Sequence, residues 1–261
     1  MTFANAKQRF SNRVADYVRY RPGYPAEVLR YLSEQCGLHA GHIVADIGSG
    51  TGLLSRLFLE NGNHVYGIEP NSEMQAAGEE FLHSYPGYAS IKGSAESTTL
   101  ADHSIDFVTA GQSFHWFEPE TTRLEFSRIL KPGGWVVVVS NERQTDTSPF
   151  LRDYEALLRR FGTDYARVSD SYPRLEEMRA FFGTDRVLAR DLPNTQDFDL
   201  ESLRGRLRSS SYAPAPDQSG FPQMMNELEH MFTAYQRDGF VRFEYRTRIF
   251  AGNLPSPGLG I

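Results

Sequence analysis

Three glycines in alternate positions are the first residues whose type and spacing could do chemistry. Gly48, Gly50 and Gly52 directly follow the β-branched, apolar run 43–47, and an apolar helical pattern continues over 53–59. Glycine lets a backbone take positive φ and lets a ligand approach without meeting a Cβ atom. The stretch therefore predicts a strand, a tight turn and a helix, with a flat and sizeable ligand lying on the turn.

A carboxylate further along the chain narrows the choice of ligand. Glu69 ends the second apolar run, 21 residues after Gly48, where it can accept hydrogen bonds from both hydroxyls of a ribose. A dinucleotide site would need glycine at the sixth position of the turn, which is Leu53 here, and the Gly-Lys-Ser/Thr of a phosphate loop is absent. The residues favour an adenosine ligand without deciding which cofactor carries it.

Length, charge and composition bound the class of protein. The chain has 261 residues, of which 40% are apolar and 23% are charged, so one α/β core is the simplest expectation. The net charge of −6 and the lack of a basic half argue against a nucleic-acid partner. Cys36 is the only cysteine, which excludes disulfides within the chain and a thiolate metal cluster. Without an apolar leader or a run of about 18 apolar residues, we expect a cytoplasmic protein with no membrane partner.

Strands and helices are predicted to alternate through the first 140 residues. Helices are expected at 2–20, 25–36, 53–60, from 72 and 119–130, and strands at 43–47, 64–69, 89–92, 105–110 and 135–139. The segment 131–134, Lys-Pro-Gly-Gly, is expected to end a helix and turn the chain. Five strands separated by helices imply a parallel sheet with helices on both faces.

This alternation ends beyond Ser140. Helices predicted at 149–161 and 173–182 form an insertion over 141–185, followed by a strand at 186–192 and helices at 200–208 and 221–237. In 241–250 apolar residues alternate with Arg and Glu, which indicates an antiparallel strand near an edge. We expect a single domain over 1–251, with a helical cap at 1–38, a cofactor-binding core at 40–140, strands and helices at 186–251, and a flexible tail at 252–261.

In this order the motifs resemble those of the class I S-adenosylmethionine-dependent methyltransferases. They are the acidic glycine turn at 46–52, Glu69, Ala95-Glu96, the fourth strand and the Pro-Gly-Gly turn, and the resemblance covers 40–140. This part is similar to the type 11 methyltransferase domain, and 112–117, Gln-Ser-Phe-His-Trp-Phe, resembles the small-molecule subgroup that includes trans-aconitate methyltransferase-like proteins. The resemblance implies a Rossmann-like α/β fold: a seven-stranded, mostly parallel sheet with an antiparallel strand and a helical lid. It also implies S-adenosyl-L-methionine as cofactor and S-adenosyl-L-homocysteine as product.

A cofactor site around the glycine turn is implied by the same resemblance. In it, Asp46 orients the turn, Met74 covers one face of the adenine and Glu96 reads the adenine amino group. Met74 could equally be a core residue, and Glu96 a solvated acid. The cofactor-binding residues expected on this basis are Tyr17, Arg21, Asp46, Gly48, Ser49, Gly50, Gly52, Glu69, Pro70, Met74, Ala95, Glu96 and Gln112.

The amino-terminal stretch 17–25 resembles the segment that closes over the cofactor in this subgroup. Arg21 would suit the carboxylate of the methionine moiety, and a ring of Tyr17, Tyr20 or Tyr24 could face the sulfonium. A solvated arginine and half-buried tyrosines are the alternative.

Gln112, His115 and Trp116 are the catalytic residues that the resemblance implies, because the segment after the fourth strand lines the methyl-transfer centre in such enzymes. A sulfonium donor is already activated, so the protein mainly has to hold two partners in line, and no metal is required. The sequence agrees, since it has no Cys/His cluster and no His-Glu-x-x-His run. A neutral His115 could take a proton from a hydroxyl or amine, or only position a carboxylate, and we favour positioning. As alternatives, His115 could be a lid residue and Trp116 a core residue.

These patterns predict a soluble enzyme that transfers a methyl group from S-adenosylmethionine to a carboxylate, hydroxyl or amine of a small molecule. One alternative is a cofactor-binding interaction module without catalysis, and a less favoured one is an NAD-dependent oxidoreductase. We expect the insertion at 141–185 and the segment 210–212 to close the pocket. The sequence leaves open which acceptor is used, and whether the protein is a monomer or a homodimer.

Overall fold

A seven-stranded sheet forms the centre of the protein. The computed structural model describes residues 14–163, 165 and 172–255. The strands are β1 (Ile43–Ile47), β2 (His64–Ile68), β3 (Tyr88–Ile91), β4 (Ile105–Gly111), β5 (Leu130–Arg143), β6 (Leu188–Phe198) and β7 (Val241–Gly252), in the order β3-β2-β1-β4-β5-β7-β6. β7 is antiparallel to both of its neighbours, and all other pairs are parallel. This confirms the predicted Rossmann-like, mostly parallel sheet.

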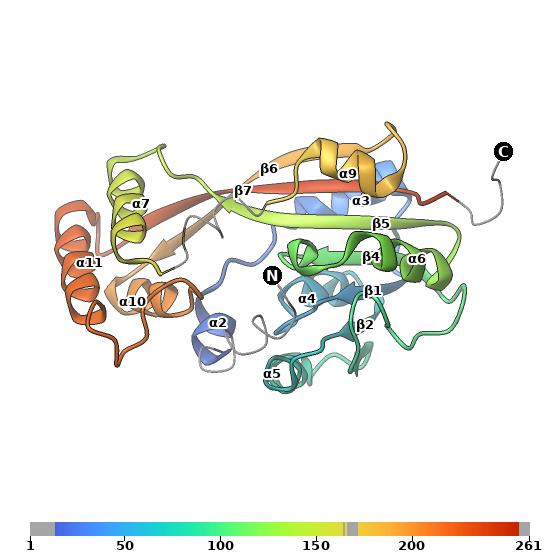
Figure 1. The fold of residues 1–261 in the computed structure, drawn as a ribbon, viewed down its shortest axis with the longest axis horizontal. Coiled ribbons are helices and arrows are strands. Elements are labelled where there is room, and N and C mark those ends of the chain that lie inside the picture. The colour runs from blue at the N-terminus through green and yellow to red at the C-terminus, as the bar shows by residue number, and fades with distance from the viewer. Residues whose placement is uncertain (1–13, 164, 166–171, 256–261) are drawn as a thin grey trace.

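Helices cover both faces of the sheet (Figure 1). They are α2 (Val14–Tyr20), α3 (Glu27–Cys36), α4 (Leu53–Glu60), α5 (Ser72–Leu82), α6 (Pro119–Ile129), α7 (Pro149–Phe161), α9 (Leu175–Phe182), α10 (Leu200–Arg208) and α11 (Phe221–Tyr235), with a 3-10 turn η1 at Phe114–Trp116. One face is packed by Leu32 of α3 and Phe58 of α4, the other by Phe126 of α6 and Phe182 of α9. Residues 2–13 of the first predicted helix lie outside the described residues. Within the described part, none of the helices has the length and apolar character needed to cross a membrane.

Two strands, β5 and β6, differ clearly in length from the prediction. β5 begins at Leu130 rather than at residue 135, because Leu130 pairs with Ile105 before an irregularity in the register, where Gly133 takes a φ of 80°. The Lys-Pro-Gly-Gly segment that we predicted as a turn therefore lies inside β5. β5 and β6 also continue to Arg143 and Phe198, because β7 pairs with them over that length.

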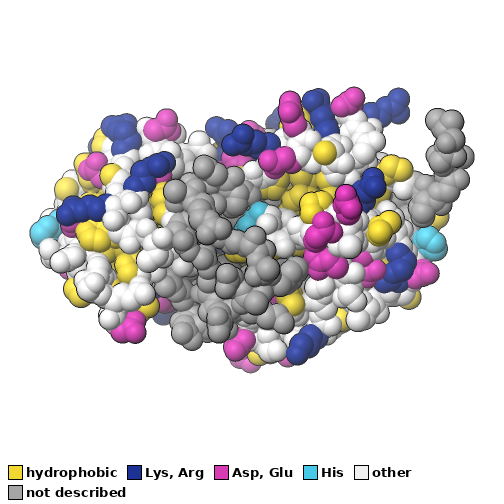
Figure 2. Space-filling view, in the orientation of Figure 1, with side chains coloured by type: hydrophobic (Ala, Val, Ile, Leu, Met, Phe, Trp, Pro, Cys, Tyr) yellow, Lys and Arg dark blue, Asp and Glu magenta, His cyan; other side chains and the backbone are white. Residues whose placement is uncertain are grey.

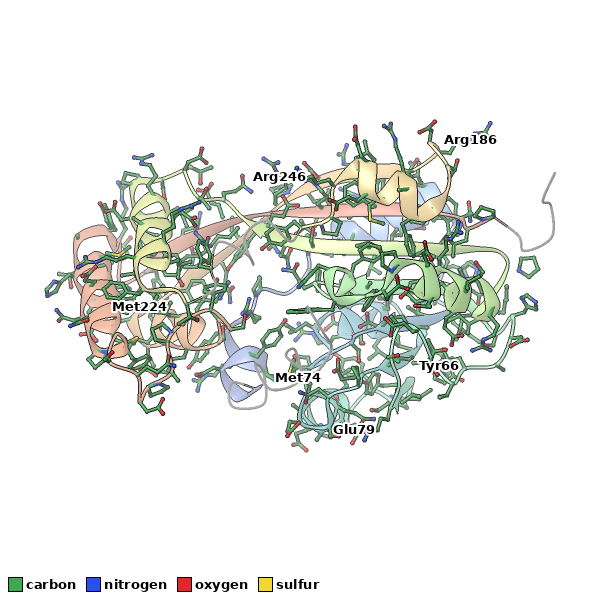
Figure 3. All side chains as sticks on the ribbon, viewed as in Figure 1. Tyr66, Met74, Glu79, Arg186, Met224 and Arg246 are labelled. Carbon is green, nitrogen blue, oxygen red and sulfur yellow. The ribbon has the colours of Figure 1, made fainter. Side chains whose placement is uncertain are left out.

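Besides the two hydrophobic cores on the faces of the sheet, a third core lies where β5, β6 and β7 extend beyond the parallel part of the sheet. α7, α10 and α11 pack there, at the end of the molecule remote from α6 (Figure 1). Met224 of α11, labelled in Figure 3, is fully buried in this core. The Phe243 ring lies 4.8 Å from the rings of both Tyr154 and Phe198, so one side chain of β7 joins α7 to β6.

α2 connects this third core to the parallel half of the protein. Tyr20 packs against Gly205 of α10, where an added Cβ atom would lie 2.0 Å from the tyrosine ring. Arg208 of α10 donates to the carboxylate of Asp16 at 2.9 Å. α2 also contacts α5, so it bridges the two parts of the chain.

We expect Phe243→Ala to lower the free energy of unfolding by about 3 to 5 kcal/mol, because it removes a fully buried ring and leaves a cavity in the third core. Phe240→Ala is the control, because this ring is 50% exposed and its loss should cost about 1 kcal/mol or less. Urea unfolding followed by circular dichroism measures both changes. Equal effects of the two substitutions would contradict a stabilising third core.

Candidate active site

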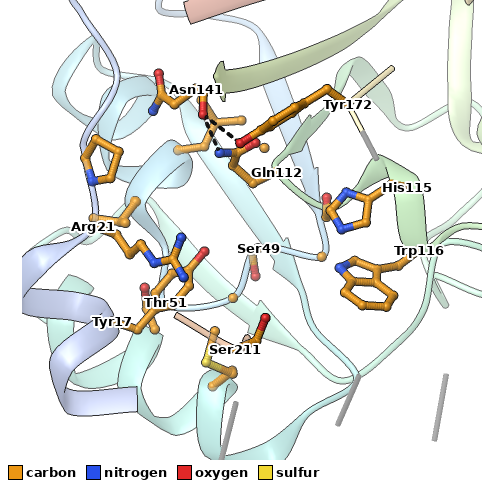
Figure 4. Close-up of a pocket in the computed structure, with 18 of the residues that line it drawn as sticks. Tyr17, Arg21, Ser49, Thr51, Gln112, His115, Trp116, Asn141, Tyr172 and Ser211 are labelled. Carbon is orange, nitrogen blue, oxygen red and sulfur yellow. Dashed lines mark hydrogen bonds between the residues drawn. The ribbon is translucent and has the colours of Figure 1, made fainter. Parts of the chain in front are cut away.

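A cavity of about 410 Å³ opens at the carboxyl ends of the central strands. The turn after β1, the loop after β4 and the last residues of β5 all line it, and Figure 4 shows it in close-up. Parallel α/β sheets bind ligands at this edge, because the loops that follow the strands meet there. The volume falls within the range of about 300 to 1,000 Å³ that is typical of cofactor and substrate sites.

The glycine turn forms one wall of the cavity. Gly48 and Gly50 have φ values of 65° and 56°, which strain any other residue. An added Cβ atom at Gly48 would lie 2.6 Å from Cβ of Ser113, so the loop after β4 packs directly on the turn. Gly52, predicted as a cofactor contact, does not line the cavity. It precedes α4 at a φ of 83°, and an added Cβ atom would lie 2.5 Å from Leu82 of α5, so its function is packing.

Glu69 holds the glycine turn through its carboxylate. The backbone N–H of Gly50 donates to Oε2 at 2.9 Å, and that of Asn71 donates to Oε1 at 2.8 Å. The side chain lines the cavity and is 8% exposed. Because each carboxylate oxygen can accept more than one hydrogen bond, the same group can also receive hydroxyls of a ligand.

Asp46, which we predicted to orient the glycine turn, lines the cavity and anchors the helix that follows the turn. Its carboxylate accepts hydrogen bonds from the hydroxyls of Ser55 at 2.6 Å and Thr109 at 3.1 Å, so it ties α4 and β4 to β1, while Glu69 holds the turn. Burial raises the pKa of Asp46 to about 6, although these two hydrogen bonds act in the opposite direction.

Met74, Pro70 and Ala95, three of the predicted cofactor-binding residues, line the cavity beside the turn. Met74 is 6% exposed. Glu96, which we predicted to read the adenine amino group, does not line the cavity. Its carboxylate accepts a hydrogen bond from the backbone N–H of Glu118 at 3.1 Å, so it holds the start of α6.

Arg21 and two of the three predicted tyrosines reach the cavity from the amino-terminal segment. The Arg21 guanidinium lies 4.8 Å from the ring centroid of Tyr17 and donates to the carbonyl of Ser209 at 2.9 Å. Its Nε atom is buried, with no hydrogen-bond partner among the described residues. Tyr17 and Tyr24 line the cavity, whereas Tyr20 packs against α10 instead.

Gln112 anchors the loop after β4. Its φ of 57° is unusual for a residue with a side chain and turns the chain back toward the cavity. The Gln112 amide donates to the carbonyl of Asn141 at 3.1 Å, and the hydroxyl of Tyr172 donates to the same carbonyl at 3.4 Å (Figure 4).

His115 and Trp116 follow in η1 and both line the cavity. Their ring centroids are 4.7 Å apart. Figure 4 shows the two rings next to each other. Burial by the surrounding protein lowers the pKa of His115 to about 4. The ring is exposed to the open cavity, however, so water there moderates this effect until a ligand fills the space.

The opposite wall comes largely from the two segments that we expected to close the pocket. Asn141, Arg143, Glu155, Tyr165 and Tyr172 belong to 141–185, and Ser211 and Tyr212 to 210–212, whereas Arg206 and Tyr245 were not predicted. One signal was present: Arg206 lies between Leu203 and Leu207 on the buried stripe of α10. No group of His, Cys, Asp or Glu in the described part of the chain could hold a metal ion.

Comparison with known proteins agrees with this geometry. A model of the type 11 methyltransferase domain matches residues 45–138. An uncharacterized methyltransferase-like protein of Schizosaccharomyces pombe is 26% identical over 247 residues, which are 93% of this chain and 94% of that protein. An uncharacterized methyltransferase of Mycobacterium tuberculosis is 35% identical over 134 residues, which are 51% of this chain and 52% of that protein. The chain thus aligns with nearly all of one relative and about half of the other.

Solved structures share the fold. A candidate type II methyltransferase from Anaeromyxobacter dehalogenans matches with a TM-score of 0.66 at 20% identity, over 90% of this chain and 99% of that one. Phosphoethanolamine N-methyltransferase 2 from Haemonchus contortus, solved with phosphomonomethylethanolamine and S-adenosylhomocysteine, matches with a TM-score of 0.57 at 17% identity, over 97% of this chain and 59% of that one. Taken together, these matches identify residues 45–138 as a methyltransferase domain, within a chain that has the fold of S-adenosylmethionine-dependent methyltransferases.

Proposed function

We propose that this methyltransferase acts on a small molecule, which binds in the same cavity as the cofactor. The observation that carries this proposal is the continuity of the cavity, which joins the glycine turn to the wall formed by the third core. A continuous cavity of this kind suits a small acceptor held in line with a sulfonium. The acceptor atom is an oxygen or nitrogen of a carboxylate, hydroxyl or amine.

Each side of the cofactor has candidate binding residues. Glu69 accepts hydrogen bonds from the ribose hydroxyls while it holds the glycine turn, and Met74 packs on the adenine. Arg21 binds the methionine carboxylate, since its guanidinium is buried on the cavity wall next to Tyr17. A bound S-adenosylmethionine would supply an activated methyl group, and the protein's part is to orient both partners and exclude water.

His115, Trp116 and Gln112 lie on the acceptor side of this arrangement. A histidine with a pKa well below its ordinary value is neutral near pH 7 and is a weak base. It can still donate or accept a hydrogen bond, so we assign His115 to positioning the acceptor. Trp116 supplies a flat apolar surface beside it, and Gln112 keeps the loop in place through Asn141.

We expect Glu69→Ala to weaken S-adenosylhomocysteine by about 1.5 to 3 kcal/mol, because it removes hydrogen bonds to a charged acceptor. Glu69→Gln keeps an oxygen for one of the two backbone N–H groups and should lose less. Isothermal titration calorimetry measures both affinities, and circular dichroism verifies the fold. Unchanged affinity in the alanine variant would remove Glu69 from the cofactor site.

We expect the rate to show no titration of His115 between about pH 6 and 8, because burial beneath a bound acceptor keeps the pKa of this imidazole below its ordinary value and the ring neutral in that range. Protonation begins only at lower pH, so activity should decline on the acid side alone. The His115→Gln variant should raise KM more than it lowers kcat, with a pH profile parallel to that of the wild type. If the wild type shows an inflection near pH 6.5 that the variant lacks, His115 acts as a base.

Two other functions have distinct outcomes. An interaction module would bind S-adenosylhomocysteine but transfer no methyl group to any member of a broad acceptor panel. An NAD-dependent oxidoreductase would bind NADH tightly and S-adenosylhomocysteine not at all. Mass spectrometry of ligands that remain bound through purification tests the acceptor class directly.

A further inference from the structure

Three arginines lie buried on the wall of the cavity, and one of them has a carboxylate partner. Arg143 pairs with Glu155 at 2.8 Å. For Arg21 and Arg206 no ion pair with a carboxylate is formed by the residues that the structure describes. A guanidinium keeps its charge at every pH at which a protein folds, and an uncompensated buried charge is costly. The wall therefore carries surplus positive charge that calls for a counter-ion.

Arg206 shows this most clearly. Arg206 is 4% exposed. Its guanidinium donates to two neutral hydroxyls, those of Ser210 at 2.9 Å and Tyr245 at 3.4 Å. Neutral oxygens satisfy hydrogen bonds but do not offset charge. On the face of the protein in Figure 2, Lys and Arg side chains are interspersed with Asp and Glu. That face therefore shows no basic patch to which Arg206 would belong.

The two guanidiniums of the third core are held in fixed positions. Arg143 lies 6.0 Å and Arg206 5.9 Å from the ring centroid of Phe243, and Arg143 also lies 5.0 Å from that of Tyr154. Aromatic rings hold a planar guanidinium by its face and leave its N–H groups at the edge. The Nη1 atom of Arg143 is buried without a hydrogen-bond partner in the described part of the chain.

The pKa of Tyr212 indicates the electrostatic potential at the wall that carries these arginines. Burial by itself would raise its pKa, but the positive charges of Arg206, Arg143 and Arg21 outweigh burial and lower the pKa below the ordinary tyrosine value. The wall therefore favours negative charge on a group that lies between the arginines.

We propose that Arg206 and Arg143, with the hydroxyls of Tyr245 and Tyr212, form a subsite for a carboxylate or phosphate group of the methyl acceptor. This inference rests on the proposed function and adds to it the chemical class of the substrate. The anionic group is a recognition element on the wall built by the third core, and the acceptor atom lies toward the loop after β4. Fixed guanidiniums bind carboxylates and phosphates through paired, charge-assisted hydrogen bonds, which neutral analogues cannot form.

The test uses the full-length enzyme saturated with S-adenosylhomocysteine and three probes of similar size. Phenylacetate and phenyl phosphate carry the two anionic groups, and phenylacetamide is the neutral counterpart. We expect at least one anion to bind roughly tenfold or more tightly than the amide by calorimetry. The preferred anion then distinguishes a carboxylate from a phosphate subsite. Equal binding of all three probes would overturn the proposal.

Arg206→Met removes the charge and keeps most of the side-chain volume. Because it removes an uncompensated buried charge, we expect the variant to fold with an unchanged or higher Tm and to lose the preference for anions. Arg204→Met on the same helix is the matched control, because Arg204 pairs with Glu229 outside the cavity and should leave the preference intact. An Arg206→Met variant that keeps the preference contradicts the proposal.

Cofactor affinity separates this inference from the function on which it rests. If the wild type does not bind S-adenosylhomocysteine, the proposed function itself fails. If Arg206→Met loses affinity for S-adenosylhomocysteine as much as for the anions, Arg206 serves the cofactor carboxylate and the acceptor subsite is wrong. Asp164 and Asp170 lie outside the described residues, so an Asp164→Asn, Asp170→Asn variant tests for an internal counter-ion. The proposal expects this variant to keep its Tm and its anion preference, and a lower Tm would contradict it.

Discussion

The pairing of β5 with β7 continues beyond the end of β4, and the cavity depends on this extension. Past Val139 the strand β5 has no β4 residue beside it, while 140–143 continue to pair with 245–248 of β7. Backbone groups on an edge inside a protein must find other partners. Gln112 and Tyr172 supply them by donating to the Asn141 carbonyl, so one freed strand edge fixes both the loop after β4 and part of the opposite wall.

The parallel half of the fold could be predicted because its local signals agree. β-branched runs, glycine turns and helical stripes follow one another with regular spacing, and each favours the same α/β sheet. The extension of β5 could not be predicted in this way. Residues 140–143 are Ser, Asn, Glu and Arg, which resemble the polar end of a strand, yet Ser140 and Asn141 are buried between β7 and the cavity.

The motifs predicted the positions of residues in the fold better than they predicted the contacts of those residues. Glu69 and Glu96 are both acids near the glycine turn in the resemblance, but a carboxylate accepts a hydrogen bond from a ligand hydroxyl or a backbone N–H equally well. In the structure Glu69 accepts hydrogen bonds from two backbone N–H groups at the cavity wall, whereas Glu96 accepts one from the backbone before α6. Arg206 was not predicted to lie at the site, because arginine is usually a surface residue. Its place between two leucines of one helix face was nevertheless visible in the sequence.

The contact between α2 and α10 also determines when the cavity becomes complete during synthesis of the chain. Arg21 finds its acceptor, the carbonyl of Ser209, 188 residues later. Strands β1 to β5 can pair as soon as they leave the ribosome, because domains generally fold from the amino terminus. At that stage β5 is an open edge, and the side of the cavity above the glycine turn is missing. Since a ligand stabilises only a state that binds it, cofactor can protect the nascent enzyme fully only after Ser209 has been made and holds Arg21, and the exposed edge of β5 is the hazard in the meantime.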